Sequence, residues 1–487
     1  METYRIADHR GFEAGGRHFL YLSRDNAVFE ADRETRDWIR RYAGDAAGLT
    51  RAVASRRQAP ASEAWAQLEA LLARRIILRE AGVEDAARAA ARSREVPLQT
   101  LVLHVTDACN LGCAYCYHGQ SSPARVAGTG CGPGKGAAMS AATARRAVDF
   151  LIAASGTCDK VVLVFFGGEP LLNFPLISET VAYARKRAAD TGKRVSFAVT
   201  TNGTLLTPRT VAFLHAQDIG VTVSMDGIEA VHDRFRRFPD GSPSYRAILP
   251  RVRTLLEAPR KKPVVARVTV AGEPEHVPET LDHLLAMGFS ETGFAPVTTD
   301  DPAFQLDARG MVRLLAQFHL LSERFLETAL RGDFLGFTNL VDLLVVLHEG
   351  EVKTHPCGAG LGLFSVSPEG RLYLCQRLTG EAEWCMGDLE GGLDHGKVAR
   401  FRAMTGVERK ADCRACWVRA VCAGGCYHEA LIREGSLTAP NRHYCEWIKT
   451  WTAMGLDVYA RLFMACPDYL DKLSLLRGHA PLHSRSI

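Results

Sequence analysis

The feature that most constrains the fold is a regular alternation of short apolar runs and amphipathic segments between residues 101 and 296. Runs with the β-branched and aromatic composition of strands lie at 101–106, 161–166, 195–200, 221–225, 264–270 and 291–296. Segments with helical periodicity lie between them, at 140–155, 175–190, 208–217, 245–257 and 278–288, and Ser140 and Thr207 are suitable helix N-caps. Strands that alternate with helices form parallel βα units. We therefore predict an α/β fold in which six units build an open, partial (β/α)6 barrel related to the eight-fold TIM barrel.

Four short motifs directly follow or end the first four predicted strands. They are the cysteines at 109, 113 and 116, then Gly167-Gly168-Glu169-Pro170, Thr200-Thr201-Asn202-Gly203 and Ser224-Met225-Asp226-Gly227. Parallel barrels carry their active sites at the carboxyl ends of the strands. We therefore expect the four motifs to share one rim.

Cys109, Cys113 and Cys116 have the spacing C-x3-C-x2-C. Four cysteines normally close a four-iron cluster, so three leave one iron free to bind an exchangeable group. The alternative is a set of buried or zinc-binding thiols.

A second cysteine-rich region spans residues 355–446. Its central run, C-x2-C-x5-C-x3-C, consists of Cys413, Cys416, Cys422 and Cys426. Cys357 and Cys375 precede this run, and Cys445 follows it. Fourteen cysteines in a chain without a signal-peptide pattern indicate metal ligation rather than disulfides. Structural zinc sites are the generic alternative. Cys158 and Cys466 suit packing, while Cys131 and Cys385 fit no pattern.

These motifs, in this order, resemble those of radical S-adenosylmethionine (SAM) enzymes, and the second cysteine region resembles the SPASM extension, which holds two auxiliary four-iron clusters. The resemblance implies that Cys109, Cys113 and Cys116 hold a [4Fe-4S] cluster whose open iron is chelated by the amino and carboxylate groups of SAM. One electron from the cluster then cleaves the sulfonium and releases a 5′-deoxyadenosyl radical.

The resemblance also implies ligands for two more [4Fe-4S] clusters, making three. Cys413, Cys416, Cys422 and Cys445 would hold one, and Cys357, Cys375 and Cys426 the other. Seven cysteines for eight places leave one auxiliary iron open, and His355 or a substrate thiolate could complete it. An iron-bound thiolate is deprotonated and oriented, as carbon–sulfur bond formation requires.

Contacts to SAM follow from the same resemblance. Glu169 would accept hydrogen bonds from the amino group, with glycines such as Gly168 letting backbone approach the ligand, although an ordinary strand-end turn is the alternative. Ser224 and Arg236 would hold the carboxylate, unless Arg236 is simply an exposed loop residue. Asn202 would touch the ribose or only make the turn, and Tyr115 would flank the adenine or pack in the core.

Five segments are expected along the chain. Residues 1–90 resemble a winged-helix peptide-recognition domain, with strands at Phe12–Gly16, Arg17–Leu22 and Ala27–Ala31, helices at Glu34–Tyr42 and Glu63–Ile76, and a linker at 85–95. A leader peptide would add as a strand to its sheet edge, or the unit is a structural cap. The other four segments are the barrel at 97–300, a helical bridge at 301–354, the SPASM region at 355–446, and a C-terminal helix and tail at 447–487. We expect helices near 307–330 and 338–348 in the bridge, and a closing helix near 446–465. The Gly/Pro-rich loop 119–138 is either a lid or disordered.

Composition excludes some classes. The net charge is only +4, which gives no strong field for nucleic acid or an anionic membrane. The N-terminus lacks a signal-peptide core, and no apolar run approaches the roughly 20 residues of a membrane helix. We expect a cytoplasmic protein.

The resemblance implies a peptide or protein maturase. The runs Gly-Arg-His-Phe-Leu-Tyr-Leu near the N-terminus and Pro-Cys-Gly-Ala-Gly at 356–360 resemble those of thioether-forming maturases, including the quinohemoprotein amine dehydrogenase maturation protein and enzymes for Cys-rich peptides. The implied partners are a Cys-containing peptide and an electron donor such as flavodoxin or ferredoxin. Two rivals stay open. One is a sulfatase-type maturase that forms formylglycine, and the other is a non-catalytic iron–sulfur or zinc protein that binds a peptide.

Overall fold

The computed structural model describes residues 2–60, 62–79, 96–117 and 136–479. The predicted linker at 85–95 and Cys131 lie outside these residues, as does most of the loop 119–138.

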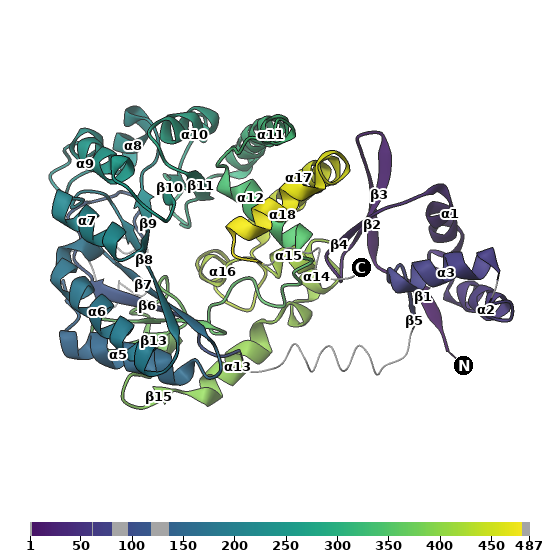
Figure 1. Cartoon of the computed structure of the whole chain (residues 1–487), viewed down its shortest axis with the longest axis horizontal. Coiled ribbons are helices and arrows are strands. Elements are labelled where there is room, and N and C mark those ends of the chain that lie inside the picture. Colours follow the sequence, from purple (N-terminus) through teal and green to yellow (C-terminus); the bar gives the residue numbers. More distant parts are fainter. Residues whose placement is uncertain (1, 61, 80–95, 118–135, 480–487) are drawn as a thin grey trace.

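A parallel sheet forms the centre of the molecule, as predicted. Its six strands are β6 (Thr100–Thr106), β7 (Lys160–Gly167), β8 (Arg194–Thr201), β9 (Ile219–Ser224), β10 (Val264–Val270) and β11 (Glu291–Pro296), in consecutive order. The covering helices are α5 (Ala141–Ala154), α6 (Phe174–Asp190), α7 (Pro208–Ala216), α9 (Tyr245–Glu257) and α10 (Val277–Ala286), which lie outside the curved sheet, with the short α8 (Glu229–Phe235) after β9 (Figure 1). The predicted strands and helices are confirmed to within two residues at each end.

Both predicted helix caps are present. The Ser140 hydroxyl accepts a hydrogen bond from the Thr143 N–H at 3.0 Å, and the Thr207 hydroxyl accepts one from the Thr210 N–H at 3.2 Å. Each cap satisfies an amide that has no partner within the helix.

The sheet does not end at β6. Strand β12 (Leu363–Val366), from the cysteine-rich region, pairs in parallel with β6, and Leu363 lies opposite Thr100. Strands β13 (Arg371–Tyr373), β14 (Cys385–Asp388) and β15 (Gly392–Leu393) then continue the sheet in antiparallel fashion to ten strands. Because β12 covers the edge of β6, the cysteine-rich region is joined to the barrel by backbone hydrogen bonds.

Helices on the far side of the barrel opening complete the main body (Figure 1). They are α11 (Ala308–Leu330), α12 (Thr338–His348) and α17 (Cys445–Ala465), as predicted, and α18 (Pro467–Leu476), which was not predicted. Phe318 of α11 anchors them, because its ring centroid lies 5.1 Å from those of both Phe337 and Trp451. Shorter helices carry the cysteine-rich region: α13 (His395–Thr405), α14 (Ala411–Arg414), α15 (Arg419–Cys422) and α16 (Tyr427–Glu434).

The N-terminal unit has two small sheets, three helices and its own apolar core. Strands β2 (His9–Ala14), β3 (Arg17–Leu22) and β4 (Ala27–Glu30) form an antiparallel sheet, and β1 (Tyr4–Ile6) pairs with β5 (Ile77–Arg79). The helices are α1 (Arg33–Tyr42), α2 (Ala46–Arg57) and α3 (Glu63–Ala73). The prediction of these residues missed α2, β1 and β5, and α3 ends three residues earlier than expected, where Arg75 takes a left-handed conformation (φ 59°). Helix α2 buries only Leu49, Thr50 and Val53 among its residues, so its periodic signal is weak.

The N-terminal unit contacts the rest of the chain through a few specific groups. The Asn26 amide donates to the carbonyl oxygens of Val346 at 2.8 Å and Glu351 at 2.9 Å, and the guanidinium of Arg10 lies 4.4 Å from the ring centroid of Trp417. These contacts fix the unit next to the cysteine-rich region.

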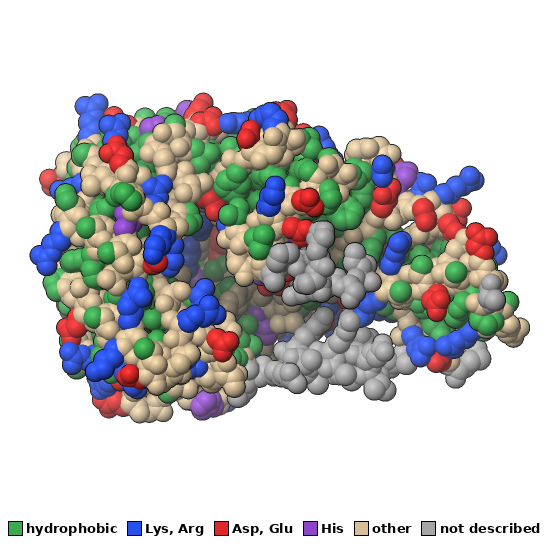
Figure 2. All heavy atoms as spheres, viewed as in Figure 1, with side chains coloured by type: hydrophobic (Ala, Val, Ile, Leu, Met, Phe, Trp, Pro, Cys, Tyr) green, Lys and Arg blue, Asp and Glu red, His purple; other side chains and the backbone are tan. Residues whose placement is uncertain are grey.

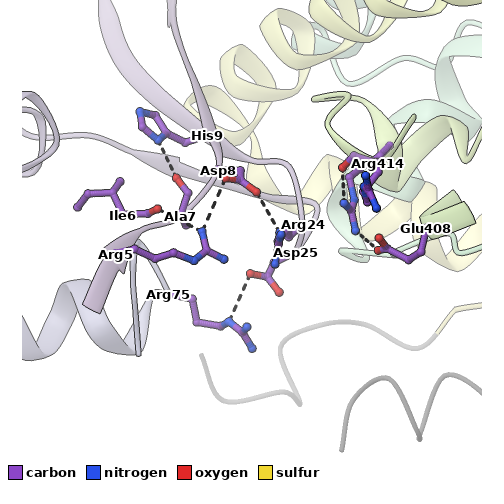
Figure 3. Close-up of polar contacts among 11 residues, drawn as sticks. Arg5, Ile6, Ala7, Asp8, His9, Arg24, Asp25, Arg75, Glu408 and Arg414 are labelled. Atoms are coloured by element: carbon purple, nitrogen blue, oxygen red, sulfur yellow. Dashed lines mark hydrogen bonds and ion pairs between the residues drawn. The ribbon is translucent and has the colours of Figure 1, made fainter. Parts of the chain in front are cut away.

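Ion pairs also lie where the N-terminal unit approaches the cysteine-rich region (Figure 3). Arg24 donates to Asp8 at 3.0 Å, and Arg75 pairs with Asp25 at 3.3 Å, with Glu408 of the cysteine-rich region across from them. Elsewhere, basic and acidic side chains are interspersed over the visible face, and the surface is hollowed between the barrel and the C-terminal elements (Figure 2). Across the described ranges, no helix is both long and apolar enough to cross a bilayer.

Candidate active site

Three thiols lie together in the loop after β6. Burial raises the pKa of Cys113 to about 11; the Arg236 guanidinium opposes this shift, and the neighbouring thiols of Cys116 and Cys109 add to it. Burial also raises the pKa of Cys109, and the nearby Cys116 thiol raises it further. Mutual electrostatic effects of this kind require the three sulfur atoms to be close. A bound metal cluster would remove the protons, because a coordinating thiol is deprotonated outright.

The cysteine loop is held by backbone hydrogen bonds to the segment after α8. The Gly112 N–H donates to the Arg237 carbonyl at 2.7 Å, and the Ala114 N–H donates to the Phe235 carbonyl at 2.9 Å. The Cys116 N–H closes a turn onto the Cys113 carbonyl at 3.1 Å. These bonds hold the cysteine loop against the segment after α8.

The two glycines after β7 make room for this loop. A Cβ on Gly168 would overlap the carbonyl oxygen of Ala108, and one on Gly167 would overlap that of Thr106. The Gly168 N–H donates to the Thr106 carbonyl at 2.9 Å, and the Glu169 N–H donates to the Ala108 carbonyl at 2.8 Å. The backbone that the glycines accommodate is thus that of the cysteine loop, whereas the sequence interpretation assigned them to a ligand.

Glu169 is fully buried, and its carboxylate is bonded on both oxygens. Oε1 accepts from the Leu171 N–H at 3.1 Å and the Thr201 hydroxyl at 2.8 Å, and Oε2 accepts from the Asn202 N–H at 2.7 Å. Burial raises the pKa of Glu169 to about 7, and the three donors oppose this shift. A carboxylate offers about four acceptor positions, so one remains on Oε2.

Asn202 makes the turn after β8. Its side-chain oxygen accepts from the Thr204 N–H at 2.9 Å, and its amide donates to the Asn110 side chain at 2.9 Å and lies 3.8 Å from the sulfur of Cys109. The turn therefore connects the third strand to the cysteine loop.

A buried carboxylate that the sequence interpretation did not single out connects Tyr115 and Arg236. Asp226 Oδ2 accepts a short hydrogen bond from the Tyr115 hydroxyl and another from Arg236 Nε at 2.9 Å, while Oδ1 accepts from the Thr269 N–H at 2.9 Å. Arg236 is only 7% exposed, so the alternative of an exposed loop arginine is wrong. Its Nη1 lies 3.9 Å from the sulfur of Cys113. Asp226 was recognisable only as part of the Ser-Met-Asp-Gly motif.

Tyr115 and Ser224 lie at the same rim. Tyr115 is 7% exposed and packs edge-on against Phe235, as the core-packing alternative expects. Ser224 ends β9 in register with Arg267 of β10, next to a small cavity of about 40 Å³ at the ends of β9 and β10 that Asp226 helps to line.

The second cysteine region brings together one group of four thiols. Burial raises the pKa of Cys413 to about 11, and the thiols of Cys422, Cys445 and Cys416 act on it as well. These are the four cysteines assigned to one auxiliary cluster. The Cys416 N–H donates to the Cys413 carbonyl at 3.0 Å.

Three further thiols form the other group. Burial raises the pKa of Cys375 to about 12, with added effects from Cys426 and Cys357. His355, the candidate for an extra protein ligand, is otherwise engaged, and so is Cys385, which fits no cysteine pattern. The ring nitrogens of His355 lie 3.1 Å from the Thr354 hydroxyl and 3.2 Å from the Arg402 carbonyl. The sulfur of Cys385 lies 3.3 Å from the Gly387 carbonyl, and the residue lines a separate surface cavity of about 370 Å³.

Zinc and a four-iron cluster place different demands on the cysteines that bind them. Within the part of the chain that the structure describes, no three His, Cys, Asp or Glu side chains converge tightly enough to hold one ion. A zinc ion draws its thiolates to about 2.3 Å. A four-iron cluster instead binds each cysteine through a different iron and so spaces them more widely. Each group consists of cysteine thiols alone, which is the ligand type that four-iron clusters use.

Arg377 contacts Tyr117 in the barrel loop and acts on two thiols of the group of three. Its guanidinium is 5.3 Å from the ring centroid of Tyr117, which directly follows Cys116, and its Nη1 donates to the Thr298 hydroxyl at 2.6 Å. Burial lowers the pKa of Arg377, but the opposing effects of Cys426 and other anionic groups exceed it and raise the pKa. A buried cation therefore lies beside the group of three and in contact with the residue that follows Cys116.

Comparison with known proteins identifies the barrel segment. Residues 103–284 match the model of the Radical SAM superfamily. An uncharacterized protein of Methanocaldococcus jannaschii is 32% identical over 147 residues, which is 30% of this chain and 45% of that protein, so the match spans less than half of that relative. The serine-type anaerobic sulfatase-maturating enzyme of Klebsiella aerogenes is 26% identical over 350 residues, covering 68% of this chain and 80% of the enzyme.

Two solved structures share the fold. The structure of native anSMEcpe with bound AdoMet has a TM-score of 0.62 at 19% identity and covers 77% of this chain and 99% of its own. Streptococcus suis SuiB bound to its precursor peptide SuiA has a TM-score of 0.52 at 13% identity and covers 91% of this chain and 100% of its own. The family match thus covers residues 103–284, which carry the cysteine triplet, and the chain shares the fold of these two structures.

Proposed function

We propose that this protein is a radical SAM enzyme that modifies a peptide or small protein. The observation that carries the proposal is the meeting of Cys109, Cys113 and Cys116 with Glu169 and Arg236 at the carboxyl ends of the parallel strands. The family match over this segment and the sulfatase-maturating relatives support the same class of reaction.

The barrel residues would hold the cluster and SAM together. The three thiolates would hold a [4Fe-4S] cluster, which when bound supplies the electron that cleaves SAM. Asp226 occupies Nε of Arg236 and the Cys113 sulfur lies 3.9 Å from Nη1, so Nη2 and the second hydrogen of Nη1 can bind a carboxylate in a fork geometry. Glu169 has one acceptor position left for an ammonium group. Asn202, Ser224 and Tyr115 complete the proposed SAM site, and Gly168 supports it by letting the cysteine loop approach the end of β7.

We assign the other seven cysteines to two auxiliary [4Fe-4S] clusters. Cys413, Cys416, Cys422 and Cys445 would form a complete set, and Cys357, Cys375 and Cys426 a set with one iron open to a substrate thiolate. A bound thiolate would be deprotonated and held near the barrel opening, which suits thioether formation. We therefore propose a thioether cross-link in a Cys-containing peptide as the product, with a flavodoxin or ferredoxin as electron donor.

The N-terminal unit is the proposed leader-binding element. Its sheet has β2 and β4 as edge strands, and most of the β2 side chains are not buried. A peptide strand can add to such an edge through main-chain hydrogen bonds. The aligned share of this chain also rises from 77% with anSMEcpe to 91% with the peptide-bound SuiB structure.

Formylglycine formation is the second candidate, and the sulfatase-maturating relatives favour it. Mass spectrometry of a small Cys-containing peptide, encoded near this gene and co-expressed with the enzyme, separates the two candidates. A thioether predicts the loss of two hydrogens per modified cysteine and resistance to alkylation. An aldehyde at a cysteine or serine would instead establish the second candidate.

The reaction class is tested on protein reconstituted without oxygen and then reduced. We expect 5′-deoxyadenosine to form and about 12 irons per chain to bind. The Cys109→Ala/Cys113→Ala/Cys116→Ala variant should keep about 8 irons per chain. It should form no 5′-deoxyadenosine. If wild-type protein binds stoichiometric zinc and leaves SAM intact, the proposal is wrong and the chain is a metal-containing binding protein.

A further inference from the structure

Lys410 is a buried cation next to the auxiliary cysteines. The residue is 3% exposed, and its Nζ is one of the buried polar atoms for which the described residues supply no hydrogen-bond partner. Burying an unpaired ammonium group is costly, so proteins almost always provide a counter-charge. A missing acceptor at this position points to a group that the polypeptide does not itself supply.

The position of Lys410 connects it to both groups of auxiliary cysteines. Its carbonyl accepts the Cys413 N–H at 3.0 Å, which fixes the residue at the edge of the group of four. Its side chain extends towards Gly424, where a Cβ would lie 2.7 Å from Nζ. Gly424 lies in the chain between Cys422 of the group of four and Cys426 of the group of three. The ammonium group also lies 5.5 Å from the ring centroid of Tyr427, which follows Cys426.

The electrostatic neighbours of Lys410 divide evenly between the two groups. Burial lowers the pKa of Lys410, and the thiols that oppose this are Cys413 and Cys422 from one group and Cys357 and Cys426 from the other. Other cations act within one group. Lys449 acts with Cys416 and Cys445, and Arg377 acts with Cys375 and Cys426.

We propose that the Lys410 ammonium group donates hydrogen bonds to sulfur atoms of both auxiliary clusters and raises the reduction potentials of both. The inference rests on the proposed function, because it requires the two clusters to be present. Hydrogen bonds to cluster sulfurs and local charge are among the factors that set these potentials. Reduction makes a cluster more negative, so a nearby positive charge stabilises the reduced state. One side chain would then couple the potentials of the two clusters.

The test is an EPR-monitored redox titration of the Lys410→Met variant, with a side chain of similar length and no charge. It is done in the Cys109→Ala/Cys113→Ala/Cys116→Ala background, so that the signals come from the auxiliary clusters. We expect both potentials to fall, with the reduction equilibrium of each changing about tenfold, or about 59 mV for one electron. Lys410→Arg keeps the positive charge, so both of its reduction potentials should stay close to those of the protein with Lys410.

Lys449→Met is the matched control. Lys449 is also close to cluster cysteines, but its side chain is 34% exposed and its Nζ is paired with Glu446 at 2.7 Å. Solvent and its partner screen this charge, so its removal should leave both potentials nearly unchanged. If Lys410→Met binds about 8 irons but its potentials equal those of the control, the inference is wrong. If the background variant itself binds no iron, the proposed auxiliary clusters are wrong instead.

A second measurement keeps the inference testable if Lys410→Met fails to assemble clusters. The chain that carries Lys353→Arg and Lys449→Arg lacks two other described lysines that act on auxiliary cysteines. Labelled with ¹⁵N-lysine and reduced, it should show a hyperfine coupling between lysine nitrogen and the cluster electron spins. Absence of that coupling in iron-loaded protein would overturn the assignment of Lys410.

Discussion

Glu169 shows how burial controls protonation at the residue scale. Its ordinary pKa is 4.5, and burial raises the pKa in the folded protein to about 7. The folded state therefore holds the proton more tightly than the unfolded state does. This contribution to stability is fully present below pH 4.5 and is lost as pH rises through about 7.

We predict that Glu169→Gln removes this pH dependence. Both proteins are compared without SAM. As pH rises from 4 to 8, the free energy of unfolding of the wild type should fall by up to about 3 kcal/mol more than that of Glu169→Gln. Urea denaturation of both proteins across that range measures the difference. Parallel pH profiles would show that the three hydrogen-bond donors outweigh burial and keep the carboxylate charged.

Asp226 is the second residue whose burial has a measurable consequence, because it is the counter-charge of Arg236. Asp226→Ala leaves a buried guanidinium without a partner, and we predict a loss of about 3–5 kcal/mol in the free energy of unfolding. The double variant Asp226→Ala/Arg236→Leu removes both charges and should recover part of that loss. A double variant less stable than the single one would contradict the pairing.

At the scale of elements, the strand ends and the cysteine loop depend on one another. The Gly168 position allows no side chain, because a Cβ would meet the Ala108 carbonyl oxygen. We predict that Gly168→Ala displaces the cysteine loop from β7 and lowers the iron content from about 12 to about 8 per chain. Iron analysis and EPR after reconstitution check this.

Gly11→Ala is the control for that substitution. Gly11 lies in β2, and a Cβ there would have no atom within 4 Å. It should keep the full iron content. An equal loss in both variants would mean that the glycine motif does not specifically support the barrel cluster.

At the scale of the whole molecule, Asn26 holds the N-terminal unit against the main body. It adopts a left-handed conformation (φ 48°), and its side chain also accepts the Tyr21 hydroxyl at 2.9 Å. We predict that Asn26→Ala weakens this docking, because it leaves buried partners unsatisfied at about 1–3 kcal/mol each. Hydrogen exchange should become faster in β2–β4 and in the segment 346–351, and stay unchanged in β7 and β8.

Asn26→Gly separates the two causes. Glycine accepts the left-handed backbone without strain but lacks the amide. Faster exchange in both variants assigns the docking to the hydrogen bonds, whereas faster exchange in Asn26→Ala alone would assign it to the backbone conformation.

Local patterns in the sequence determined much of this molecule. The periods of the apolar residues predicted the six barrel strands and their helices, because a strand or helix buries one face whatever its partner is. Ser140 and Thr207 were recognisable as caps because capping involves residues three apart. The cysteine spacings indicated two metal-binding regions, and the family resemblance divided the second region into two groups. By contrast, α2 and α18 were missed.

Tertiary structure alone decided the rest, because periodicity does not specify a partner. Nothing local to residues 363–366 shows that β12 joins β6, since that choice depends on which sheet edge is available. Three contacts depend on residues that only folding brings together. They are the pairing of Arg236 with Asp226, the packing of Gly168 against Ala108, and the position of Lys410 near two groups of thiols. Spacing thus indicated what kinds of groups the chain carries, and folding determined which of them meet.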